Sequence, residues 1–138
     1  MNREKDAYND LCSYALTRND ATFIHQHVVD AYTAQQADCK SNPIAIAFAL
    51  VGLYLLVERN WSGRQIQIAH MQLSRRRRSW PAFDLPCDRG SITAVKVMKT
   101  HEGAERDSAI RAWCASIWEA YADCREEVAS LLRKHGIV

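Results

Sequence analysis

Two histidines and an aspartate, close together in one stretch of the chain, are the residues best suited to chemistry. The stretch reads FIHQHVVDAYTAQQ, from Phe23 to Gln36. On a helix, His27 and Asp30 lie one turn apart at the border of the apolar face. An imidazole beside a carboxylate has a raised pKa and can act as an acid, a base or a ligand. The alternative is that Asp30 only orients a structural histidine or pairs with an arginine.

A metal site at this position needs a third ligand from another element. His70 is the best candidate, because its spacing from Ile66 and Leu73 places it at the edge of another apolar helical face. His27, Asp30 and His70 are then the candidate ligands of a metal-dependent hydrolase or transferase. The chain has no HExxH or Glu-x-x-His motif. We therefore expect no resident cofactor and keep a divalent metal as the alternative.

Four consecutive arginines, Arg75, Arg76, Arg77 and Arg78, form the second candidate site. Residues 41–100 hold nine Lys or Arg against three Asp or Glu, whereas both flanking parts of the chain are acidic. Arginine binds phosphate groups bidentately, so this run is typical of a phosphate-ligand, RNA or DNA contact. The alternative is a helix end whose arginines interact with the helix dipole and with neighbouring acids.

Two tryptophans in the segment WCASIWEAY, residues 113–121, form the third candidate. On one helix they can wall a ligand pocket, or they can belong to the core. The same helix carries Cys114 and Cys124 on its apolar stripe, where thiols act as small apolar groups. We predict one ligand pocket, edged by His25, His27, Asp30, Tyr32, His70, Trp113 and Trp118.

Helices must position all of these residues, because apolar residues recur three or four positions apart and no hairpin signal occurs. We predict an all-α fold, a compact bundle of five to six helices in a single domain spanning the chain. The predicted helices cover residues 4–17, 21–38, 43–59, 62–77, 91–99 and 105–134, and residues 79–90 are irregular.

Local signals place several helix ends. Asp20 is the predicted N-cap of the second helix, and Asn42 followed by Pro43 starts the third. Ser62 and Gln65 form a capping box at the start of the fourth helix.

The third helix, residues 43–59, is the predicted centre of the bundle. Residues 44–57 are apolar or small without interruption, a run of 14 residues. Spanning a bilayer takes ~20 such residues, so we predict a buried core helix and no membrane span.

Composition limits the class of protein further. The chain has 138 residues, of which 48% are hydrophobic and 25% charged, as in an ordinary globular domain. Its five cysteines form no CxxC pair, and the polar N-terminal segment MNREKDAYND has no signal-peptide character. We predict a cytoplasmic protein with free thiols.

Four segments together resemble a bacterial family of uncharacterised, stand-alone helical proteins. They are HQHVVDAYTAQ, IAFALVGLYLLVE, WPAFDLP followed by SITAVKV, and WCASIWEAY, and the resemblance covers residues 8–136. It implies a domain of unknown function, and it implies no activity. Some relatives carry additional histidines near the positions of Gln36, Ala49 and Cys124, which this chain lacks. The resemblance extends to His25, Asp30, Tyr32, Gln35, Trp113 and Trp118.

Three hypotheses of function follow. The leading one is a binding or interaction module whose partner is a small molecule or a protein, with His27, Asp30 and His70 at the edge of its pocket. The second is the metal-dependent enzyme, and the third is the nucleic-acid or phosphate binder built on residues 75–78. Association with further copies of the chain also stays open, because Trp61 and Trp80 lie outside the predicted helices.

Overall fold

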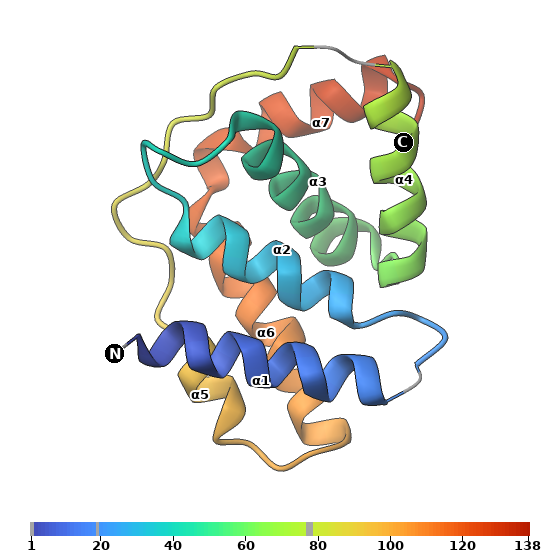
Figure 1. The fold of residues 1–138 in the computed structure, drawn as a ribbon. Helices are drawn as coiled ribbons and strands as arrows, with labels where there is room; N and C mark the ends of the chain where they lie inside the picture. Colours follow the sequence, from blue (N-terminus) through green and yellow to red (C-terminus); the bar gives the residue numbers. More distant parts are fainter. Residues whose placement is uncertain (1, 19, 77–78) are drawn as a thin grey trace.

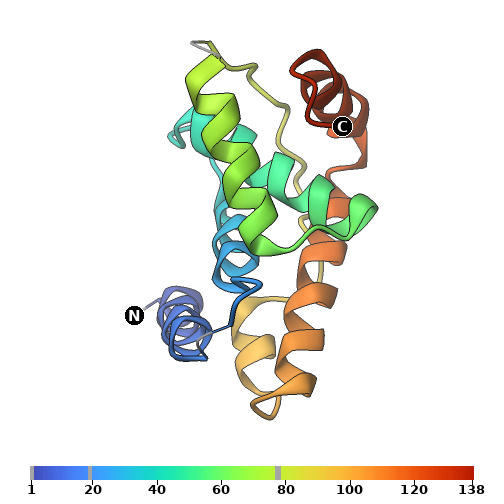
Figure 2. The same cartoon turned by 90° about the vertical axis from the view of Figure 1, so that its right-hand side faces the viewer.

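The computed structural model describes residues 2–18, 20–76 and 79–138, and within these ranges it contains only helices and loops (Figures 1 and 2). The all-α prediction is therefore confirmed for the described part of the chain. The helices are α1 (Arg3–Thr17), α2 (His25–Gln36), α3 (Pro43–Arg59), α4 (Gly63–Arg76), α5 (Ala94–Met98), α6 (Ala104–Ala120), the 3-10 turn η1 (Ala122–Cys124) and α7 (Arg125–Lys134).

Helix α3 contacts four other helices, α2, α4, α6 and α7. It begins as predicted, with the Asn42 side chain accepting a hydrogen bond from the Ile44 amide at 3.1 Å. Ten of its residues are buried, and among them Leu50, Leu53 and Leu55 have no exposed surface. No helix of the described residues has the length and apolar character needed to cross a membrane.

The start of α2 differs from the prediction, because Asp20 does not cap it. The Asp20 carboxylate accepts hydrogen bonds from the Thr22 amide at 2.9 Å and from the Thr22 hydroxyl, which closes a turn before the helix. Phe23 then adopts a left-handed backbone conformation with φ of 61°. A β-carbon on Gly63 would lie 1.8 Å from the Phe23 carbonyl oxygen. Because α4 approaches Phe23 this closely, the helical conformation of α2 begins only at His25.

The predicted helix 105–134 is also wrong, since it divides into α6, η1 and α7. The chain turns at Tyr121, where φ is −92° and ψ is 21°. The Tyr121 hydroxyl donates to the Ala34 carbonyl at 2.6 Å. After the turn, Arg125 pairs with Glu58 of α3 at 2.6 Å, so α7 runs across α3 instead of continuing α6 (Figure 1). One apolar stripe persists through the turn, which is why the sequence pattern did not reveal it.

The irregular segment 79–93 is held against the C-terminal end of α2. The Arg89 guanidinium donates to the carbonyl oxygens of Gln35 and Ala37. The Gln35 amide in turn donates to the Ile92 carbonyl at 2.7 Å. Phe83 anchors this segment in the core, with only 8% of its surface exposed.

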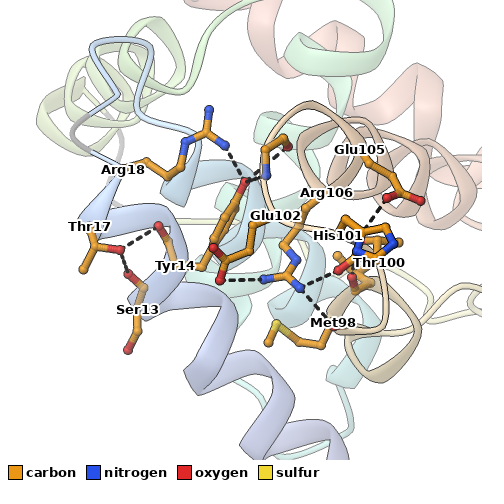
Figure 3. A network of polar contacts seen from close by, with 12 residues as sticks. Ser13, Tyr14, Thr17, Arg18, Met98, Thr100, His101, Glu102, Glu105 and Arg106 are labelled. Carbon is orange, nitrogen blue, oxygen red and sulfur yellow. Dashed lines mark hydrogen bonds and ion pairs between the residues drawn. The ribbon is translucent and has the colours of Figure 1, made fainter.

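A polar network joins α1 to the start of α6 (Figure 3). The Tyr14 hydroxyl donates to the Asp107 carboxylate at 2.8 Å and accepts from Arg18 and from the Gly103 amide. The buried Arg106 side chain lies over the Tyr14 ring at 4.9 Å and donates to the carbonyls of Met98 and Thr100, at the end of α5. Tyr14 and Arg106 together therefore fasten α1, α5 and α6 to one another.

Removing the Tyr14 hydroxyl tests this network. We expect the Tyr14→Phe variant to lose roughly 1–3 kcal/mol of unfolding free energy, because the Gly103 amide and the Asp107 carboxylate lose a partner. Urea unfolding followed by circular dichroism measures the loss. Tyr8→Phe is the matched control, since the hydroxyl of Tyr8 interacts with the weakly hydrogen-bonding thiol of Cys12. Equal stability losses in the two variants would contradict the role of Tyr14.

Candidate functional site

His27 and Asp30 are both buried in α2, at 2% and 3% exposure, yet no hydrogen bond or ion pair joins them. Burial lowers the pKa of His27 to about 4, and the positive charge of Arg111 adds to this effect. The sequence analysis predicted a raised pKa for this imidazole, which is wrong because no carboxylate contacts the ring. His27 is therefore neutral at physiological pH.

The Asp30 carboxyl group lies between α2 and α3 without a positive partner. One oxygen accepts from the Gln26 side-chain amide at 3.0 Å, and the other, Oδ2, has no hydrogen-bond partner. The backbone of Gly52 leaves this oxygen just enough room, because a β-carbon there would lie 1.8 Å from it. Burial raises the pKa of Asp30 well above its usual range. The site favours a protonated, neutral carboxyl group.

His70 is buried on α4 and is already engaged by Phe48 of α3. The two rings stack with centroids 4.7 Å apart and an interplanar angle of 4°. The Nε2 atom donates to the Phe48 carbonyl at 2.8 Å, since a carbonyl oxygen only accepts. Burial lowers the pKa of His70 to about 4.

The structure does not bring the three predicted metal ligands together. Among the residues that it describes, no group of three His, Cys, Asp or Glu side chains lies close enough to hold a metal ion. Five hollows of the described surface are lined by residues other than His27, Asp30 and His70.

The two tryptophans of the predicted pocket lie in the core. Their indole N–H groups are used internally: Trp113 donates to Gln35 at 2.9 Å and Trp118 donates to Glu58 at 2.7 Å. Tyr32 is half-buried and stacks on Tyr8 of α1, with ring centroids 4.0 Å apart.

His25 is half-buried at the start of α2, with its ring edge toward Phe23. None of the seven predicted pocket residues lines one of the five hollows named above. A ligand-binding role for them stays a prediction.

Two members of the arginine run, Arg75 and Arg76, are exposed in the last turn of α4. Arg76 donates to the His135 carbonyl at 2.7 Å and so ties α4 to the C-terminal end of the chain. Arg77 and Arg78 lie outside the described residues. Phosphate or nucleic-acid binding by residues 75–78 stays a prediction.

The outward face of α4 is the candidate site that the structure adds. Four residues spaced four, three and four positions apart form one line along this helix: Arg64, Ile68, Met71 and Arg75. Ile68 is 49% exposed and Met71 is 50% exposed. The opposite side of the helix carries its buried residues, Ile66, Ala69, His70 and Leu73. We call the outward line the α4 face; α4 lies toward the viewer in Figure 2.

A hollow of about 310 Å³ adjoins the α4 face. Ile68 belongs to both, so the hollow continues the apolar part of the face sideways. Trp61, half-buried before α4, and Ile137 near the C-terminus supply its other large apolar side chains. The complete lining is Trp61, Gln65, Ile68, Ala69, Gln72, Gly136 and Ile137.

The arginines at the two ends of the α4 face differ in how they are held. The Arg64 guanidinium lies over the Phe23 ring at 4.9 Å and donates to Gln67 at 2.8 Å. Arg75 is exposed and forms no ion pair with another described residue. Ile68 and Met71 were not among the site residues predicted from the sequence. Their spacing from the two arginines is the signal that could have placed all four on one side of the helix.

Comparison with known proteins gives a family and no activity. A model of a protein family of unknown function matches residues 5–122. No curated protein and no solved structure matches the chain.

Replacing Asp30 by the uncharged Asn is expected to raise the unfolding free energy of the protein at neutral and alkaline pH. Because the pKa of Asp30 is raised in the folded chain, the folded state keeps its proton where the unfolded chain, with an aspartate pKa of about 4, has lost it. Parent stability therefore falls as the pH rises above that value, and Asp30→Asn removes this loss. We expect a gain of roughly 1–3 kcal/mol at pH 8 that shrinks toward pH 4. Urea unfolding across this range measures it, and a gain independent of pH would contradict it.

A methyl group at Gly52 is expected to be costly because it collides with Asp30. We expect Gly52→Ala to lower the unfolding free energy by roughly 3 kcal/mol, at the upper end of overpacking effects. In an Asp30→Ala background the colliding atoms are absent, and the same change should cost less than about 1 kcal/mol. Thermal unfolding of the four proteins in this double-mutant cycle measures both values; additive effects would rule out the contact as the cause.

Proposed function

The chain belongs to the family of unknown function DUF5946, and we propose that it is an interaction module whose α4 face binds an acidic, amphipathic helix of a partner protein. The observation that carries this proposal is the half-exposed pair Ile68 and Met71, bounded by Arg64 and Arg75 on one helical line.

Apolar exposure supports a protein partner. Two large apolar side chains at about half exposure are adjacent on a helix whose opposite side is already buried in the core. Contiguous apolar surface with a polar rim is typical of a protein–protein contact. The neighbouring hollow, with Trp61 in its wall, offers room for one bulky apolar anchor of the partner.

The charges on the α4 face select the kind of partner. Arginines bound the apolar pair at both ends, so a partner helix with Asp or Glu at both ends of its own apolar pair is complementary. A second copy of α4 is not complementary. In a parallel pair Arg64 would face Arg64, and in an antiparallel pair it would face Arg75, so like charges would meet in either direction.

A designed peptide tests the proposal directly. The probe is a fluorescently labelled helical peptide with two leucines three positions apart and a glutamate four positions outside each, and its binding is measured by fluorescence anisotropy. We expect Ile68→Ser/Met71→Ser to weaken binding at least tenfold, since each buried aliphatic side chain contributes about 1.5 kcal/mol or more. Leu16→Ser is the control, because Leu16 is equally exposed, at 56%, but lies on α1.

A charge reversal distinguishes this contact from nonspecific hydrophobic binding. Arg75→Glu should lose affinity for the glutamate peptide and gain affinity for a peptide with lysine at the facing end. Unchanged binding in the α4 variants would overturn the proposal. So would tighter binding to anionic lipid vesicles than to the peptide, since that result would make the α4 face a membrane contact.

A further inference from the structure

A groove runs along the seam between the irregular segment 79–91 and the helices α6, η1 and α7. Three hollows, of about 530, 200 and 280 Å³, follow one another along it. The first two share Pro86 and Ala120, and the last two share Glu127, so the three hollows adjoin one another, and we call this row of hollows the acidic groove. In Figure 1 this irregular segment is the yellow stretch of chain that runs beside the orange and red helices.

Five exposed carboxylates rim this groove: Asp84, Asp88, Glu119, Asp123 and Glu127. None of them forms an ion pair with another described residue. Lys134, at the far end, is the one basic residue among those that line the three hollows. The lining therefore carries a net negative charge, which attracts cationic groups.

Apolar groups lie between the acids. Leu85, Pro86 and Ala120 line the middle of the groove, and Leu131 lines its last part. A row of three adjoining hollows suits an elongated occupant, and the acids together with the apolar groups suit one that carries both cationic and apolar parts. Arginine fits such a surface best, because its guanidinium pairs with carboxylates while its methylene stem covers apolar surface.

We propose that this groove binds an extended, arginine-rich segment of a polypeptide. The proposal goes beyond the α4 face, because the two surfaces share no lining residue and have opposite charge. The variants of one surface therefore test that surface alone, and failure of one proposal leaves the other intact.

The probe is a labelled peptide in which arginine alternates with leucine, and its binding is measured by anisotropy at low ionic strength. We expect Asp84→Asn/Asp123→Asn, two acids of the central hollow, to weaken binding about five- to tenfold. Asp6→Asn/Asp10→Asn is the matched control, because it changes the net charge equally with two exposed acids of α1. The control should change the affinity less than about twofold, and added salt should weaken binding to the parent.

Further experiments test whether apolar contacts contribute to binding and which kind of molecule occupies the groove. Replacing the leucines of the peptide by serine should weaken binding several-fold, and spermine at equal charge should fail to displace the leucine peptide. Equal loss in the groove and control variants, or displacement by spermine, would overturn the proposal. So would self-association of the parent chain that the groove variant abolishes, because a second copy would then occupy the groove.

Discussion

The C-terminal end of α2 is the constraint that positions both the turn after α6 and the irregular segment. A helix end leaves its last carbonyl groups without intrahelical partners, and here other elements supply the donors. The Tyr121 hydroxyl donates to Ala34, and the Arg89 guanidinium donates to Gln35 and Ala37. The first contact places the turn between α6 and α7, and the second holds the irregular segment beside it. The acidic groove exists because these two donors meet at one helix end.

Helix ends were predictable where the signal is local, and not where it comes from elsewhere in the chain. Asn42 and the Ser62–Gln65 box act within four residues, and both cap as expected. The start of α2 depends on Gly63, some forty positions away, and the turn at Tyr121 depends on Ala34. Neither contact leaves a periodic pattern in the sequence. An apolar stripe shows which side of a helix is buried, but it does not show where one helix ends and the next begins in another direction.

The site residues show the same division. His27, Asp30 and His70 were expected at the borders of apolar faces, and all three are buried. Burial disfavours the charged form, so it lowers the pKa of the two histidines and raises the pKa of Asp30. Spacing places Arg64, Ile68, Met71 and Arg75 on one side of α4, but their exposure follows from the packing of the opposite side against the core. A sequence shows which residues share a side of a helix and not whether another element covers that side.

Both proposed surfaces lack partners within the chain, and this links them physically. Ile68 and Met71 are about half exposed, and no groove acid forms an ion pair with another described residue. A partner that binds only the folded state stabilises it in proportion to the logarithm of the partner's concentration. Asp30 differs, because its unpartnered oxygen lies against Gly52 between α2 and α3. We therefore expect partners at the α4 face or the groove to stabilise the chain, whereas substitution or protonation relieves Asp30.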